Sequence, residues 1–367
     1  MHQINKTVKQ IFILVSIVSI GSLGVLLSSC SSSSPTPTVT KPGSWTQAAS
    51  FSGVGISGAA SFVIDGKAYV GGGFDASGKR RQDWWQFDPA KGWSKKTTFP
   101  GTARSGAVAF TIGGKGYVGA GSVAQGSYLK DFWEFDPLGN AGSGSWVQVK
   151  DFGDPATETG RYGCVGFTVS NRGFVAGGTT TDNGADRVTN DFWEYKPANN
   201  TWEQRTSMAF KRVNAFSFTI GNLAYVIGGF DAGKGQVVRA VEQYDPANDS
   251  WTQKLALNQK DASGATIVQP SSRESAVAFT IGEFGYIAGG LNGGSLGDTW
   301  QYNPTTDTWV QYYSFNTSQL YGGIARDGAV GFAIGNVGYM STGRNSSLQS
   351  IRLDDTLKFD PTGTPPL

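Results

Sequence analysis

Apolar and polar residues alternate along most of the chain in short runs separated by glycine and asparagine. A typical run is AFTIGGKGYVGAG (109–121), where two alternating stretches flank Gly113 and Gly114. Alternation with a period of two predicts half-buried β-strands, and a glycine pair between two such stretches predicts a tight hairpin. We therefore expect an all-β protein of short strands, in which long amphipathic helices are the exception.

This pattern recurs six times at spacings of about 48 to 61 residues, which indicates a repeat architecture. The copies are SFVIDGKAYVGGG (61–73), AFTIGGKGYVGAG (109–121), GFTVSNRGFVAGG (166–178), SFTIGNLAYVIGG (217–229), AFTIGEFGYIAGG (278–290) and GFAIGNVGYMSTG (331–343). An aromatic block follows each copy: DWWQFDP (83–89), DFWEFDP (131–137), DFWEYKP (191–197), AVEQYDP (240–246), DTWQYNP (298–304) and DTLKFDP (355–361). A tryptophan follows five of these blocks, at Trp93, Trp146, Trp202, Trp251 and Trp309.

These features together resemble the Kelch repeat, which has an apolar strand, a glycine pair, an aromatic third strand with an Asp-Pro turn, and a tryptophan on the fourth strand. The resemblance covers the whole chain after residue 43. It implies a six-bladed β-propeller with four antiparallel strands in each blade.

The sixth repeat ends before its tryptophan strand, and an extra copy of that strand stands at the other end of the chain. Residues 44–47 (SWTQ) match residues 250–253 of the fourth repeat. We therefore expect the strand around Trp45 to pair with the last three strands and close the ring, which would remove the free edges of an open sheet.

Glycine is unusually common, at 52 residues, and aromatic residues make up 13% of the chain. Gly114, Gly116 and Gly119 even have the G-x-G-x-x-G spacing of a dinucleotide-binding turn. Such a turn must lie between a strand and a helix, and no helix is expected after residue 122. We interpret the match as accidental.

The first residues have the pattern of an export signal, because Lys6 and Lys9 precede an uncharged apolar run (11–27). The following Leu-Ser-Ser-Cys resembles the lipobox of bacterial lipoproteins, which implies cleavage before Cys30 and lipidation of its thiol. An uncleaved signal anchor is the alternative. We expect a signal peptide at 1–29, a lipidated Cys30 with a flexible Ser/Pro/Thr tether at 30–43, and a propeller at 44–367. The location would be the bacterial cell envelope.

Removal of the signal would change the charge and the available ligands. The two signal lysines would leave 28 basic residues against 28 acidic ones, so attraction to nucleic acid is not expected. The single histidine, His2, would also be lost. Galactose oxidase is a propeller enzyme that needs histidine ligands to copper and a Tyr-Cys crosslink, so a copper oxidase activity is not expected of the mature chain. Cys164 would have no disulfide partner, and its apolar neighbours predict a buried, unreactive thiol. We expect no metal, no cofactor and a monomer.

Candidate binding residues are expected on one face of the propeller. The longest connection, at 254–272, joins a fourth strand to the next first strand, and variable loops on a fixed scaffold often bind ligands. An arginine recurs just before the first strand of five repeats, at Arg104, Arg161, Arg212, Arg273 and Arg326, and Ile56 replaces it in the first repeat. Because the first strand of a blade is the innermost one, we expect these five arginines to ring the mouth of the central channel. In Kelch propellers that recognise acidic peptides, arginines at such positions contact carboxylates, and the resemblance implies that the ring forms an anion site. The alternative is a structural role, with each arginine bonding loop carbonyls or a neighbouring blade's carboxylate.

Glu274 and Asp327 stand directly after two of these arginines, where the second repeat has Ser105. They are candidates for a general base near the channel. The competing expectation is that they pair with Arg273 and Arg326 and cancel the anion site.

Two functions fit these observations. The first is a tethered, non-catalytic binding module for a protein, peptide or glycan, acidic ligands included. The second is a sugar epimerase or mutarotase, since six-bladed Kelch epimerases act on N-acetylneuraminate. No motif in the chain identifies epimerase chemistry, so no catalytic residue is assigned beyond the candidates Glu274 and Asp327.

Overall fold

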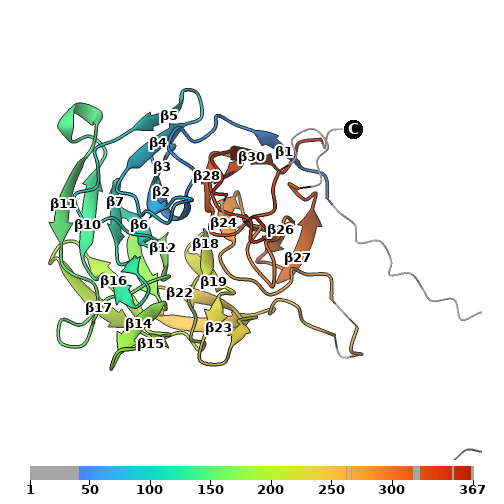
Figure 1. The fold of residues 1–367 in the computed structure, drawn as a ribbon. Helices are drawn as coiled ribbons and strands as arrows, with labels where there is room; N and C mark the ends of the chain where they lie inside the picture. The colour runs from blue at the N-terminus through green and yellow to red at the C-terminus, as the bar shows by residue number, and fades with distance from the viewer. Residues whose placement is uncertain (1–40, 262, 266, 317–322, 349–350, 365–367) are drawn as a thin grey trace, which may run out of the picture. The chain divides into compact units, whose positions relative to one another are not determined.

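The computed structural model describes residues 41–261, 263–265, 267–316, 323–348 and 351–364. In this part of the chain six sheets contain four antiparallel strands each, ordered along the chain in five of the sheets and completed by the N-terminal strand in the sixth. The predicted six-bladed, all-β propeller is therefore confirmed (Figure 1). The one helical element among the described residues is a 3-10 turn, η1 (Asn140–Gly142).

Each blade is numbered here by its order along the chain. Blade 1 contains β2 (Ser57–Ile64), β3 (Lys67–Phe74), β4 (Trp84–Asp88) and β5 (Gly92–Lys95). Blade 2 contains β6 (Val108–Ile112), β7 (Lys115–Gly119), β10 (Phe132–Asp136) and β11 (Ser145–Val149). Blade 3 contains β12 (Val165–Val169), β13 (Arg172–Ala176), β16 (Phe192–Lys196) and β17 (Thr201–Arg205). Blade 4 contains β18 (Phe216–Ile220), β19 (Leu223–Ile227), β22 (Val241–Asp245) and β23 (Ser250–Lys254). Blade 5 contains β24 (Val277–Ile281), β25 (Phe284–Ala288), β26 (Thr299–Asn303) and β27 (Thr308–Tyr312). Blade 6 contains β28 (Val330–Ile334), β29 (Val337–Ser341), β30 (Thr356–Asp360) and the N-terminal β1 (Ser44–Gln47).

The predicted closure by the N-terminal strand is confirmed. In Figure 1 the blue β1 lies beside the red β30, and Trp45 pairs with Phe359 in their register. The Trp45 indole also donates a hydrogen bond to Thr299 Oγ1 of blade 5 at 3.0 Å. The strand nearest the N-terminus therefore completes blade 6 and ties it to blade 5.

Aromatic side chains fill the spaces between neighbouring blades. Between blades 2 and 3, Phe110 stacks on Tyr117, which lies 5.2 Å from Tyr195, and Trp202 packs edge-on against Phe132. These rings belong to one buried cluster, and the other blade junctions have similar clusters. Burial of such large rings stabilises the junctions between blades.

A closed ring of backbone hydrogen bonds, here called the axial belt, joins the innermost strands of all six blades. The residue two positions after each repeated arginine donates its N–H to the carbonyl of the corresponding residue in the preceding blade, over 2.8–3.1 Å. The belt residues are Gly58, Gly106, Gly163, Asn214, Ser275 and Gly328, with φ between 54° and 65°. Such angles favour glycine, which explains why four of the six are glycine.

A second set of bonds runs in the opposite direction around the ring. The glycine that ends each of the six repeat copies donates its N–H to the carbonyl of the arginine, or of Ile56, in the next blade. Gly121, for example, donates to the Arg161 carbonyl at 2.7 Å, and a Cβ on Gly121 would lie 3.0 Å from the Ser105 carbonyl oxygen. The glycine end of the second strand is therefore required by close backbone approach.

One face of the propeller, here called the loop face, carries the connections from strand 4 to strand 1 and from strand 2 to strand 3. Three strand 2 to strand 3 connections are themselves hairpins: β8 (Ser122–Ala124) with β9 (Ser127–Tyr128), β14 (Thr179–Asp182) with β15 (Ala185–Val188), and β20 (Phe230–Asp231) with β21 (Gln236–Val237). The opposite face has tight turns, such as Gly113-Gly114 between β6 and β7, both with positive φ. The loop face therefore presents the larger and more varied surface.

Candidate functional site

The five repeated arginines lie inside their blades, and none of them is more than 3% exposed: Arg104, Arg161, Arg212, Arg273 and Arg326. They do not line the central channel, whose walls consist of residues of the first strands. The expected ring of arginines open at the channel mouth is therefore absent, because each guanidinium points away from the axis and into its blade.

Each arginine is held by a carboxylate of its own blade, in an arrangement here called the arginine clamp. Arg273 illustrates it: its two terminal nitrogens lie 2.6 and 2.7 Å from the Asp298 oxygens, and Nη1 also donates to the Gly289 carbonyl at 3.0 Å. The indole of Trp300 donates to the same Asp298 at 2.6 Å. The arginine–carboxylate pairs are Arg104–Asp131, Arg161–Asp191, Arg212–Glu242, Arg273–Asp298 and Arg326–Asp355.

These contacts agree in part with the expected structural role of the arginines. Loop carbonyls accept their hydrogen bonds as expected, but the carboxylates belong to the same blade and not to a neighbouring one. Burial alone raises the pKa of Asp298, but the bonds from Arg273 and Trp300 outweigh it and hold the pKa below its ordinary value. A role for these arginines in ligand binding stays a prediction.

The residue that follows each clamp position stands at the loop-face end of a first strand, next to the channel that the first strands line, and these six residues are here called the mouth residues. In chain order these mouth residues are Ser57, Ser105, Tyr162, Val213, Glu274 and Asp327. Each lies directly before a belt residue, and five of the six form a β-bridge to the start of the strand 2 to strand 3 connection, for example Glu274 to Leu291. The belt fixes their backbones in equivalent positions, so the mouth differs from blade to blade only by its side chains.

Glu274 is a half-buried carboxylate at this mouth. Asn214 donates to its Oε2 at 2.9 Å. Burial raises the pKa of Glu274, the negative charge of Asp327 adds to this, and Asn214 and Arg344 oppose it. Glu274 therefore retains a proton to a higher pH than an exposed glutamate does.

Asp327 is 2% exposed and has two partners. Arg344 Nε donates to its Oδ1 at 2.8 Å, and Ser295 Oγ donates to its Oδ2 at 2.7 Å. The expectation that Glu274 and Asp327 pair with Arg273 and Arg326 was wrong, because those arginines are turned into the blades and bonded to Asp298 and Asp355.

Tyr162 brings an aromatic ring to the same mouth. It stacks on Tyr128 of the β8–β9 hairpin, with ring centroids 5.9 Å apart. Burial raises the pKa of Tyr162 and the charge of Glu274 adds to this, whereas the positive charges of Arg344 and Arg80 oppose it. The hydroxyl, two carboxylates and two guanidinium groups thus lie close enough to influence one another.

A cavity of about 200 Å³ lies in blade 1, where Ile56 replaces the repeated arginine. Asp83, the counterpart of Asp298, is bonded instead by Arg81 at 3.0 Å and Lys95 at 2.8 Å. Blade 4 also departs from the clamp pattern, because Ala240 replaces the aspartate and Glu242 holds Arg212 from two residues further on. There too a cavity of about 290 Å³ adjoins the altered position.

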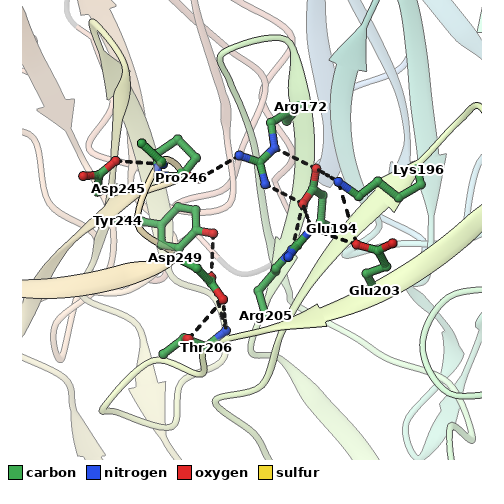
Figure 2. A network of polar contacts seen from close by, with 11 residues as sticks. Arg172, Glu194, Lys196, Glu203, Arg205, Thr206, Tyr244, Asp245, Pro246 and Asp249 are labelled. Carbon is green, nitrogen blue, oxygen red and sulfur yellow. Dashed lines mark hydrogen bonds and ion pairs between the residues drawn. The ribbon is translucent and has the colours of Figure 1, made fainter.

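A second charged cluster ties blade 3 to blade 4. Figure 2 shows Arg172, Lys196 and Arg205 around Glu194, which accepts bonds of 2.6–2.8 Å from all three. Burial opposes ionisation, but these bonds lower the pKa of Glu194 from 4.5 to about 2. Arg172 also donates to the Pro246 carbonyl of blade 4 at 2.8 Å, so the cluster has a structural role between blades.

Two further sequence predictions concern cysteines. Cys164 lies half-buried on the channel wall, and burial raises the pKa of its thiol. Cys30, with the predicted signal and most of the tether, lies outside the described residues. No helix among the described residues is long and apolar enough to span a membrane.

The carboxylate partners of the arginines were not predicted from the sequence, although a signal was present. Five of the six aromatic blocks open with an aspartate, and four of these five accompany an arginine in the same repeat. The block without the aspartate has a glutamate two positions later. Arg344 was missed as well, because nothing in its sequence neighbourhood places it beside Asp327.

Comparison with known families finds a match over most of the propeller. The sequence model described as the Attractin/LZTR1 beta-propeller matches residues 45–300, which is more than half of the chain. No curated protein sequence matched the chain.

Proposed function

Because the chain belongs to the Attractin/LZTR1 beta-propeller family, we propose that it is a non-catalytic interaction module that binds a protein, peptide or glycan at the mouth of the channel on its loop face. The single observation that carries the proposal is the contrast between the axial belt and the mouth. Backbone geometry repeats six times, yet the mouth side chains include serine, tyrosine, valine, glutamate and aspartate. If the mouth residues only stabilised the scaffold, we would expect them to repeat from blade to blade as the belt does.

The mouth has the chemistry of a mixed polar site. Arg344 is partly exposed while it holds Asp327, and the half-buried Glu274 and the stacked Tyr162 lie near it. Guanidinium groups recognise carboxylates by paired hydrogen bonds, and an aromatic ring packs against peptide side chains or sugar rings. This combination favours a ligand with both charged and apolar parts.

Binding should be tested by screening glycan and peptide collections against the purified protein and its Glu274→Gln variant. We expect the variant to weaken binding of a selected ligand by about tenfold, as loss of one charged contact does. The matched control is Glu283→Gln, an exposed glutamate in the turn between β24 and β25 on the opposite face. Equal affinities of Glu274→Gln and the wild type would contradict a mouth site.

The raised pKa of Glu274 favours a second candidate, a sugar epimerase or mutarotase in which this carboxylate moves a proton. NMR exchange measurements with N-acetylneuraminate and related sugars would test it. Exchange no faster than in buffer would remove this candidate and leave the binding module intact.

The N-terminal pattern supports the further proposal that the propeller is anchored to a bacterial membrane through a lipid on Cys30. In a bacterial host, Cys30→Ser should move the protein from the membrane fraction to the soluble fraction. Unchanged fractionation would favour the uncleaved signal anchor.

A further inference from the structure

Blade 1 retains the surroundings of a clamped arginine without the arginine itself. In blade 2 the Arg104 guanidinium lies over the Phe99 ring at 4.9 Å, bonds both Asp131 oxygens, and donates to the Ala120 and Thr102 carbonyls. The counterparts of these four residues in blade 1 are Phe51, Asp83, Gly72 and Val54. All four line the blade 1 cavity, together with Ile56 and Trp85.

The carboxylate of Asp83 is held less tightly than the carboxylates of the clamps. Arg81 and Lys95 each supply one contact, whereas Arg273 supplies a two-bonded fork to Asp298. The Lys95 side chain is 54% exposed, so displacement of its ammonium group into water costs little. The hydrogen bond from Lys95 lowers the pKa of Asp83, and burial opposes it, so the group is ionised at neutral pH.

Lys95 also departs from the repeat in a way that matches the missing arginine. The residue in its register position is glutamine in the five other blades: Gln148, Gln204, Gln253, Gln311 and Gln47. Blade 1 therefore lacks the buried arginine and has two cations, Arg81 and Lys95, at the rim of the cavity. The rim charges neutralise Asp83 without filling the space.

The acceptors in this cavity favour a planar cation. Its lining includes the Asp83 carboxylate and the counterparts of the two residues whose carbonyls bond Arg104, beside the Phe51 and Trp85 rings. A carboxylate together with backbone carbonyls holds a guanidinium in five other places of this chain. An anion would have to take Arg81 and Lys95 away from Asp83. We propose that the blade 1 cavity binds the guanidinium group of an arginine side chain presented by a partner protein or peptide, which displaces Lys95 from Asp83.

This site is separate from the mouth residues, so its test is independent of the proposed function. The probes are N-acetyl-arginine amide, its neutral isostere N-acetyl-citrulline amide, and acetate, each titrated into the full protein while NMR follows the Trp85 indole signal. We expect saturable shifts with the arginine probe alone. Shifts with acetate alone, equal shifts with citrulline, or no shift with the arginine probe would overturn the proposal.

Two variants sharpen the test. Ile56→Arg places the protein's own guanidinium in the cavity and should weaken arginine binding at least about tenfold, whereas Ile56→Leu should not. Lys95→Gln introduces the residue of the other blades, removes the competing ammonium and should strengthen binding by about threefold. Folding of each variant is checked by its amide NMR spectrum. Undiminished binding by a folded Ile56→Arg variant, or weaker binding by Lys95→Gln, would contradict the assignment.

Discussion

Blades 5 and 1 have the same four strands but differ at the clamp. Blade 5 buries Arg273 against Asp298 and Trp300, whereas blade 1 has Ile56 at the arginine position and a cavity beside Asp83. The carboxylate is present in both blades, so the fold tolerates it with a buried arginine or with cations at the rim. The comparison shows that a buried arginine is one way to neutralise this carboxylate, and that the blade without the arginine has a cavity on the loop face.

The largest effect is expected from removal of the strand that completes blade 6, which lies between the two compared blades. Deletion of residues 44–50 would expose the edge of β30 and remove Trp45 from its contacts with blade 5. We expect the ring to open and the melting temperature to fall sharply, as measured by calorimetry. A deletion variant that melts no earlier than the wild type would refute closure by β1.

The second prediction compares truncation at the same position in both blades. Arg273→Met leaves Asp298 without its buried partner and should cost about 3 kcal/mol of stability, measured by urea unfolding. Ile56→Met keeps the apolar volume of blade 1 and should cost less than about 1.5 kcal/mol. Similar losses for the two variants would show that the clamp does not stabilise blade 5.

Acidification offers a related test of the clamp. The pKa of Asp298 is lower in the folded protein than its ordinary value of 3.8, so its contribution to stability is present above that value and is lost as pH falls through the lower, folded pKa. Arg273→Met removes the main group that lowers this pKa. We therefore expect the free energy of unfolding of the variant to fall less than that of the wild type between about pH 5 and pH 2. This range covers about one to two pH units on either side of the ordinary pKa. An unchanged slope would indicate that Asp298 gains nothing from Arg273.

A third comparison replaces the carboxylate of each blade by an amide. Asp298→Asn leaves the fully buried Arg273 charge without an anion and should cost about 3 kcal/mol. Asp83→Asn affects partly exposed partners and should cost less than about 1 kcal/mol, with a dependence on salt concentration that the blade 5 variant lacks. Urea unfolding at low and high salt measures both, and a larger loss in blade 1 would reverse the comparison.

The smallest effect is expected from conversion of blade 1 to the blade 5 pattern. The double variant Ile56→Arg with Lys95→Gln restores the residues that blade 5 has at both positions. We expect a change in stability of at most about 1 kcal/mol, since a new buried pair offsets its own desolvation. A loss well above this value would show that blade 1 lacks the space for an arginine.

Much of this fold follows from the sequence because its signals are local and repeated. The hairpins depend on alternation and on turn residues within about a dozen positions, and the closing strand (44–47) has the same sequence as residues 250–253 of the fourth repeat. The orientation of the clamp arginine side chains into their blades cannot be predicted from such local signals. It depends on Asp298 and its counterparts, which lie about 25–30 residues away and approach only when strand 3 pairs with strand 2.

The sequence predicted the positions of the two carboxylates at the mouth but not their hydrogen-bond partners. Glu274 and Asp327 were identified because they break the repeat, and the structure does bring them to one place. Their partners Asn214, Ser295 and Arg344 come from other segments, and no spacing rule relates them. Long-range polar contacts of this kind are specified by the packed blades as a whole.

The axial belt has a further consequence for how order is lost. A linear stack of repeats has two end units that fray first, but the belt is a circuit in which every donor has an acceptor in the adjacent blade. No blade is an end unit, so opening any one of them breaks bonds to both of its neighbours. The six belt amides should then share one rate of exchange with solvent deuterium, set by opening of the ring and not by six independent local motions.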